Sequence, residues 1–235
     1  MPDYTVGVDL GGTKLLVAQV HPDGQLGSTS SYRTAVEDGP EGVLAQVARV
    51  VSREFEEGPP VAVGIGVPGL VDTITGECTF SPNLHWQQVP VARLLGSVLG
   101  VPVYVDNDVN LAALAEHRLG AGQGYRDLIM VTIGTGIGAG LILDGKLYRG
   151  SGGSAGELGH LPVDPQGAQC TCGRRGCLET TCSGTAIGRR ATQLAHPASL
   201  LWGKPPPDAR AVFAAARQGD ELAREVVREA VDWLG

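Results

Sequence analysis

The chain has 235 residues, of which 43% are hydrophobic and 18% are charged, and its formal net charge is −7. This composition is typical of a folded globular protein, and the length suits one large or two modest domains. The acidic balance argues against a nucleic-acid partner, which would favour a basic face. No apolar run approaches the roughly 20 residues of a membrane span. Because the start of the chain also lacks the pattern of a signal peptide, we expect a cytoplasmic protein.

The first part of the chain predicts alternating strands and helices. Strands are expected at 4–10, 15–20 and 26–33, with Gly11, Gly12 and Thr13 closing a hairpin between the first two. Between Gly39 and Gly58, apolar residues recur at the spacing of one face of a helix, which predicts a helix there. These residues are Leu44, Val47, Ala48, Val51 and Phe55. A buried strand at 61–67, a short helix at 90–99 and a strand at 101–105 should follow. This alternation indicates an α/β layer structure.

The second part opens with a repeat of the first. The segments VGVDLGGTKLLVAQV and IMVTIGTGIGAGLIL both predict a strand, a Gly/Thr turn and a returning strand, which suggests two related halves. Around the second copy, the predicted elements are a helix at 109–119, a turn at 120–124 and strands at 128–133 and 139–143. Helices are expected last at 183–195, 208–217 and 220–234.

Three cysteines and a histidine lie close together in the sequence and have the residue types of a tetrahedral Zn²⁺ site. The four candidate ligands are His160, Cys170, Cys172 and Cys177. Gly173 and Gly176 would let the backbone turn between the thiolates. The alternative is a disulfide between two of the cysteines, which is rare in the cytoplasm. Cys78 and Cys182 lie outside the cluster, and we expect them to be buried or neutral thiols.

Two glycine-rich hairpins are candidates for binding phosphate through backbone N–H groups. Their residues are Asp9, Gly11, Gly12, Thr13 and Lys14 in the first and Gly134, Thr135 and Gly136 in the second. The first is not a Walker A loop, because a strand and not a helix follows it. A single hairpin of this kind is more often only a turn. The second copy favours phosphate binding.

Polar residues gather after the strand at 101–105. Asp106, Asn107, Asp108 and Asn110 stand at the start of a predicted helix, where one of them would suffice as an N-cap. A carboxylate at that position also stays ionised and can accept a proton. Farther along, Glu157 would ordinarily be a solvated surface residue, but it precedes the candidate zinc ligand His160 by three residues.

Together these motifs resemble the ROK family of sugar kinases and repressors, and within it the bacterial glucokinases. The resemblance rests on DLGGTK, GVPG, SPNLHW, DNDVN, IGTGIGAG, AGELGH and CTCGRRGCLE, which run almost from end to end. It implies an actin-like, ribonuclease H-like α/β fold of two domains with a zinc-binding insertion and the active site in the cleft. The implied domains are 1–107, with the first phosphate loop, and 108–235, with the zinc motif.

The resemblance also implies roles for individual residues. Asp108 would be the general base that takes the proton of the 6-hydroxyl of a hexose, most of all D-glucose, as this oxygen attacks the γ-phosphorus of ATP. Mg²⁺ and the two glycine loops would neutralise the phosphates, with Asp9 near the Mg²⁺. The implied sugar contacts are Asn107, Glu157, His160 and Glu179, with Asn83 and Gly69 as additional candidates. Zinc would be structural, and a homo-oligomer, a dimer or a tetramer, is expected.

Two alternatives to a glucokinase stay open. The same motifs suit a kinase for another hexose, such as fructose or N-acetylmannosamine, and a non-catalytic sugar-binding or regulatory protein. Members of the family continue with another glycine-rich segment that clasps the adenosine and with further helices. We therefore expect this sequence to be C-terminally incomplete and to bind ATP poorly.

Overall fold

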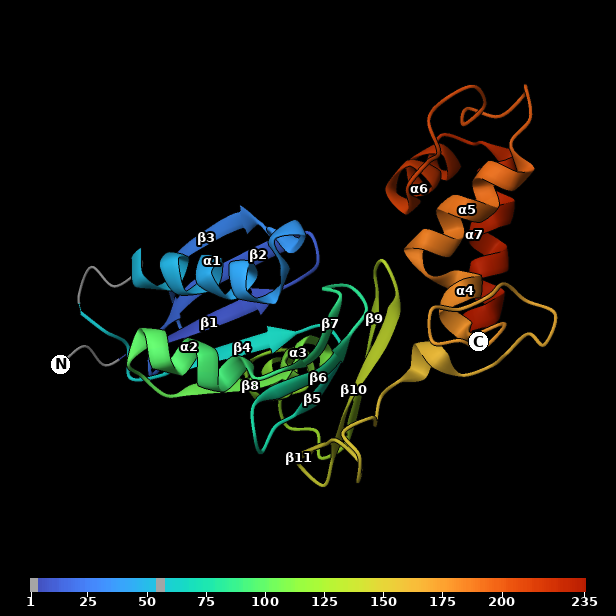
Figure 1. Cartoon of the computed structure of the whole chain (residues 1–235). Helices are drawn as coiled ribbons and strands as arrows, with labels where there is room; N and C mark the ends of the chain where they lie inside the picture. Colours follow the sequence, from blue (N-terminus) through green and yellow to red (C-terminus); the bar gives the residue numbers. More distant parts are fainter. Residues whose placement is uncertain (1–3, 54–57) are drawn as a thin grey trace. The chain divides into compact units, whose positions relative to one another are not determined.

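The computed structural model describes residues 4–53 and 58–235. Contact density divides the chain into two compact units (Figure 1). Unit 1 consists of the residues up to Ile129 together with Gly140–Ala155, and unit 2 consists of Met130–Ala139 and Gly156–Gly235. The bounds of these units differ from the predicted domain boundary after Asn107. That boundary stays a prediction. No helix in the described ranges is long and apolar enough to cross a membrane.

Unit 1 is built on a five-stranded sheet in the order β3-β2-β1-β4-β8. Its strands are β1 (Thr5–Leu10), β2 (Lys14–Val20), β3 (Leu26–Arg33), β4 (Val63–Val67) and β8 (Val103–Asn107). The first three strands form an antiparallel meander, and β4 and β8 run parallel to β1. The predicted strand at 101–105 ends two residues too early, because Asp106 and Asn107 still pair with β4 although their side chains are polar.

Helices cover this sheet. They are the 3-10 helix η1 (Val36–Asp38) and the α-helices α1 (Gly39–Arg53), α2 (Val91–Leu99) and α3 (Asp108–Leu119). Leu44, Val47, Ala48 and Val51 of α1 are buried in one apolar core with Val63 and Ile65 of β4, as their spacing predicts; Phe55 lies outside the described residues. Because side chains alternate along a strand, Gly66 faces away from this core, and there it adjoins α3.

A small sheet in unit 1 was not predicted. Its antiparallel strands are β5 (Leu70–Asp72), β6 (Glu77–Ser81) and β7 (Trp86–Val89), in the order β5-β6-β7. These strands have only three to five residues, and the turn between β6 and β7 holds His85 at a φ of 57°. So short a run shows no period-2 pattern that could be read from the sequence.

A third sheet contains the second glycine hairpin. Its strands are β9 (Leu128–Ile133), β10 (Ile137–Leu143) and β11 (Lys146–Tyr148), in the order β11-β10-β9. The hairpin between β9 and β10 confirms the repeat of the β1–β2 plan that the sequence predicts. The short strand β11, which pairs with β10, was not predicted.

Of the third sheet, unit 2 contains only Met130–Ala139, and the other named elements of this unit are helices. They are η2 (Leu158–His160), α4 (Leu178–Cys182), α5 (Gly184–Leu194), α6 (Ala209–Arg217) and α7 (Glu221–Leu234). Side-chain oxygens of Ser183, Asp208 and Asp220 cap the N-termini of α5, α6 and α7. Apolar residues of these helices form one core with Ile137 of β10. The predicted helices at 183–195, 208–217 and 220–234 are confirmed, and α4 was not predicted.

Candidate functional site

In unit 1, three parallel strands end side by side at one edge of the sheet. The register pairs Asp9 of β1 with Gly66 of β4, and Gly66 with Asp106 of β8. Beyond these positions the chain leaves the sheet as the first glycine hairpin, the turn before Gly69 and the start of α3. In open α/β sheets this carboxyl edge is where ligands bind.

Asn107 is the N-cap of α3. Its Oδ1 accepts hydrogen bonds from the backbone N–H groups of Val109, at 2.9 Å, and Asn110, at 3.0 Å. Its Nδ2 donates to the carbonyl oxygen of Gly69 at 3.0 Å, which joins α3 to the turn after β4. The sequence left open which residue of the polar cluster at 106–110 caps the helix, and in the structure this residue is Asn107. Asp108 is left as the first residue of the helix.

Asp108 is a partly buried carboxylate close to a second acidic residue. Burial is the main cause that raises its pKa above the usual range for aspartate, the N–H of Val109 works in the opposite direction, and the charge of Asp9 raises the pKa further. Burial also raises the pKa of Asp9, against the charge of Lys14. Gly66 allows this close packing, because a Cβ atom there would lie 3.2 Å from the Cα of Asp108.

The backbone of the first glycine hairpin is hydrogen-bonded both within the hairpin and to the residue that follows β3. The N–H of Gly11 donates to the carbonyl of Lys14 at 2.9 Å. Thr34, at the end of β3, donates its hydroxyl to the carbonyl of Gly11 at 2.7 Å and its N–H to the carbonyl of Thr13 at 3.0 Å. Three backbone groups of the tip are therefore fixed by neighbours within unit 1.

Two glycines bring further candidate residues to this hairpin. A Cβ at Gly12 would lie 2.8 Å from the carbonyl oxygen of Asn83, so Asn83 lies directly beside the hairpin. Gly69 has a φ of 119°, and a Cβ there would lie 2.2 Å from the carbonyl oxygen of Phe80. Both positions require glycine. Unit 1 thus gathers its predicted site residues at one edge of the sheet.

In unit 2, the second glycine hairpin borders a cavity. The carbonyl of Gly134 accepts the N–H of Gly184 at 2.8 Å, and the carbonyl of Thr135 accepts the hydroxyl of Thr185 at 2.8 Å. These bonds join the hairpin to the N-terminus of α5. A cavity of about 870 Å³ lies here, and its lining includes Gly134, Thr135, Gly184, Thr185, Gly188 and Arg189.

Sequence reasoning missed the part of this cavity that α5 contributes. Gly184 and Gly188 stand one helical turn apart, and a Cβ at Gly188 would lie 2.3 Å from the carbonyl oxygen of Pro207. Such a glycine pair at i, i+4 was the available signal, because glycine inside a helix costs stability and needs a packing or functional reason.

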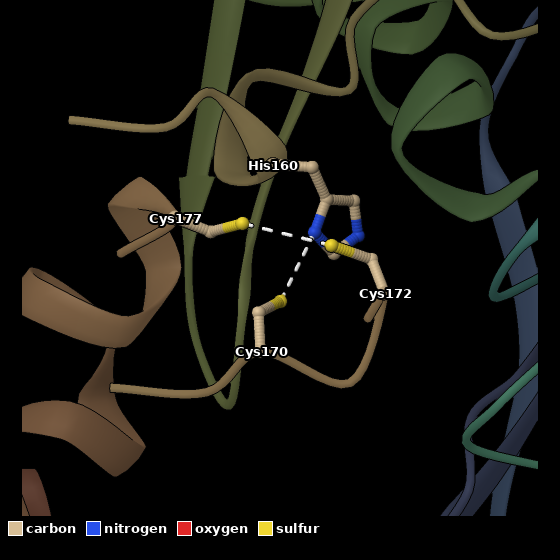
Figure 2. A group of neighbouring side chains, drawn as sticks. All are labelled: His160, Cys170, Cys172 and Cys177. Atoms are coloured by element: carbon tan, nitrogen blue, oxygen red, sulfur yellow. Dashed lines mark hydrogen bonds between the residues drawn. The ribbon is translucent and has the colours of Figure 1, made fainter. Parts of the chain in front are cut away.

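His160, Cys170, Cys172 and Cys177 form a cluster whose ligand atoms all lie within 4.8 Å of one another (Figure 2). Nδ1 of His160 lies 3.5 Å from the sulfur of Cys170. The sulfurs of Cys172 and Cys177 are 3.6 Å apart, well beyond the roughly 2.05 Å of a disulfide bond. One imidazole and three thiols converging on one point fit a closed structural zinc site.

The knuckle around this cluster depends on its glycines. Gly173 has a φ of 88° and Gly176 a φ of 63°, both in the region that favours glycine. At Gly176 a Cβ would lie only 1.5 Å from the carbonyl oxygen of Asp164. The tight turning between the second and third cysteines is therefore confirmed.

Glu157 and Glu179 both approach His160. Glu157 Oε2 lies 3.7 Å from Nε2 of the imidazole, and Glu179 Oε1 lies 3.5 Å from Nδ1. The sulfur of Cys170 also donates to Glu179 Oε1 at 3.0 Å. A Cβ at Gly136 would lie 2.8 Å from Glu179 Oε2. Glu179 thus touches both the metal cluster and the second glycine hairpin, all within unit 2.

Comparison with known proteins gives a consistent result. The model of the ROK family matches residues 5–235. The glucokinase of Thermotoga maritima is 41% identical over 238 residues, which cover 97% of this chain and 74% of that protein. The crystal structure of a ROK family glucokinase from Streptomyces griseus in complex with glucose and AMPPNP is 40% identical with a TM-score of 0.87, and the match covers 98% of this chain and 76% of that one.

A regulator is also among the relatives. The xylose repressor of Caldicellulosiruptor bescii is 30% identical over 240 residues, which cover 98% of this chain but 60% of the repressor. The family match and the likeness to the Streptomyces griseus structure confirm the predicted actin-like α/β fold. The cluster of one histidine and three cysteines agrees with the zinc site expected from the sequence.

Proposed function

The chain belongs to the ROK family, and from this premise we propose that it transfers the γ-phosphoryl group of ATP to a hexose, D-glucose above all, giving glucose 6-phosphate. One observation carries the proposal. Asp108 stands partly buried at the carboxyl edge of three parallel strands, beside the N-cap Asn107 and in the same unit as the first glycine hairpin. This is an arrangement suited to receiving a proton from a bound hydroxyl group.

Asp108 is the proposed general base. Phosphoryl transfer asks the protein to position the attacking oxygen and to stabilise charge, so one carboxylate aimed at the sugar hydroxyl suffices for the proton. The raised pKa of Asp108, which burial and then the charge of Asp9 favour, makes it a stronger base than an exposed aspartate. Its backbone is held by the cap at Asn107 and by close packing on Gly66.

The two glycine hairpins are the proposed phosphate contacts. Gly11, Gly12, Thr13 and Lys14 would supply backbone N–H groups, a hydroxyl and an ammonium, and the loop of Gly134, Thr135 and Gly136 would act in the same way. The 870 Å³ cavity beside Thr135 is the proposed place of the nucleotide. A Mg²⁺ ion that accompanies ATP would neutralise phosphate charge near Asp9.

The proposed sugar contacts are Asn107, Asn83, Gly69, Glu157, His160 and Glu179. His160 has one ring nitrogen for each task, since Nδ1 faces the cysteine sulfurs while Nε2 faces Glu157. Zinc held by the four ligands would fix the tautomer and the direction of the imidazole, and this is a structural task.

A coupled assay of ADP release over a panel of hexoses tests the proposal. Wild-type protein should turn over glucose faster than fructose or N-acetylmannosamine. Asp108→Ala should lower kcat by roughly 10²–10⁴-fold, the usual contribution of a general base. Asp23→Ala, which alters an exposed aspartate of unit 1, is the matched control and should leave kcat unchanged.

Other results would lead to other functions. A preference for another hexose would keep the kinase and reassign its sugar. Sugar binding without ADP release by the wild-type protein would instead favour a regulatory member, the alternative that the similarity to the xylose repressor supports. Full activity of Asp108→Ala would remove Asp108 as the base.

A further inference from the structure

In unit 1 the buried carboxylate of Asp106 forms an ion pair with the partly exposed side chain of Arg149. The Asp106 side chain is 8% exposed and that of Arg149 is 37% exposed. Nε and Nη2 of Arg149 donate to the same oxygen, Asp106 Oδ2, at 3.0 and 2.5 Å. Arg149 follows β11 directly, and Asp106 belongs to β8. The pair therefore links two segments that are 43 residues apart in sequence.

The second oxygen of Asp106 serves the start of α3. Oδ1 accepts the backbone N–H of Asn107 at 2.8 Å and Nδ2 of Asn110 at 3.3 Å. These two residues stand on either side of Asp108. The carboxylate of Asp106 thus contacts both the residue before Asp108 and the first turn of α3, the helix that begins with Asp108.

A purely structural ion pair is the simpler explanation, and the second Arg–Asp pair of the unit provides the comparison. Arg126 and Asp144 are 77% and 69% exposed, so their pairing contributes little. In the Arg149–Asp106 pair the carboxylate loses most of its hydration, and this cost offsets the attraction between the charges, so the pair adds little stability over apolar residues of the same size. The pair is better explained by a role in fixing one conformation of the neighbouring segment at the start of α3.

We propose that Arg149 is a positioning residue that holds Asp106, and through it aims Asn107 and Asp108 at the edge of the sheet. The inference rests on the proposed function for its catalytic consequence. Arginine suits this task because its planar fork offers two N–H groups on one side. The ammonium group of lysine could supply the charge, but it could not fix the carboxylate in the same orientation.

Kinetics of four variants test the catalytic consequence. Arg149→Gln should lower kcat by roughly 10- to 100-fold, the effect of misplacing a reacting group by about 1 Å, while the KM for ATP changes less than about twofold. Arg149→Lys, which keeps the charge and the fold, should lose about tenfold in kcat. Asp106→Asn alone and combined with Arg149→Gln completes a double-mutant cycle. The double variant should lose no more kcat than the worse of the two single variants, because both residues act through one contact.

Arg126→Gln is the matched control, since it removes the exposed arginine of the same unit and should keep wild-type kcat. Wild-type kcat in folded Arg149→Gln and Arg149→Lys would overturn the inference. Additive losses in the double variant would overturn it as well, because they would show that the two residues act separately.

Amide hydrogen exchange tests the positioning without any need for kinase activity. The N–H groups of Val109 and Asn110 are bound to Asn107 Oδ1, so they should exchange about tenfold faster in Arg149→Lys if the cap has loosened. Unchanged exchange at these amides, equal to that of Arg126→Gln, would defeat the inference. If wild-type protein phosphorylates no hexose, the proposed function fails while the exchange result still decides the role of Arg149.

Discussion

Gly136 couples the second glycine hairpin to Glu179, and replacing it tests that contact. In Gly136→Ala the new Cβ would lie 2.8 Å from Glu179 Oε2, and the carboxylate must move by about 0.6 Å to reach the 3.4 Å of an ordinary contact. The backbone can accept alanine there, since Gly136 does not have a positive φ. The far end of a flexible side chain yields easily, so we expect the free energy of unfolding to stay nearly the same.

The displacement should appear in the binding of the sugar. A hydrogen bond to a charged group is worth about 1.5–3 kcal/mol, which corresponds to roughly a 10- to 150-fold change in affinity. Because Glu179 is moved and not removed, we expect the sugar KM to rise toward the lower figure, about tenfold. Steady-state kinetics at saturating ATP would measure this.

Gly134→Ala is the matched control in the same hairpin. A Cβ there has no other atom within 4 Å, so it alters the loop without touching Glu179. Changes that both variants share in the KM for ATP would report on the loop itself. Equal sugar KM values in the two variants would refute the contact between Gly136 and Glu179 as a determinant of sugar binding.

Three further results are expected. Activity should fall at low pH with a midpoint above about 3.9, the ordinary aspartate value, because Asp108 works deprotonated and its pKa is raised; a pH profile of kcat/KM measures this, and a midpoint at or below the ordinary value would contradict it. Asp108→Asn should raise the free energy of unfolding at pH 7, by about 0.5–2 kcal/mol as for other stabilising substitutions, measured by urea titration. The sign follows because a folded pKa above the unfolded one costs stability as pH rises through the interval between them, and this cost persists above both values. Cys172→Ser should lose stoichiometric zinc and lower the unfolding midpoint, while Cys182→Ala, outside the cluster, keeps the metal; metal analysis that finds zinc in both would remove the assignment.

The features that sequence predicted are those encoded by neighbouring residues. The helix face of Leu44, Val47, Ala48 and Val51 has a clear period, and these residues are buried as expected. His160 and the three cysteines lie within one short segment, so their convergence on one point could be anticipated from spacing alone. Both glycine hairpins were found for the same reason, since each is a strand, a turn and a returning strand in immediate succession.

The features that could not be predicted from the sequence depend on contacts between residues far apart in the chain or on very short strands. The strands β5, β6 and β7 are too short and too polar to show a period. Nothing near Arg149 in the sequence indicates Asp106 as its partner, because the pairing depends on how β11 is placed beside α3. The contact of Gly136 with Glu179 is hidden in the same way, although each residue was a candidate by itself.

The hydrogen bonds of Asn107 limit what it can do for a ligand. A side-chain amide can accept two hydrogen bonds at its oxygen and donate two from its nitrogen. Val109 and Asn110 occupy the oxygen, and the carbonyl of Gly69 takes one of the two N–H groups. Toward a sugar, Asn107 therefore has one donor and no acceptor to offer. A sugar hydroxyl that accepts a hydrogen bond from this N–H group keeps its own hydrogen for another partner. The carboxylate of the next residue, Asp108, is the acceptor that the proposed reaction requires.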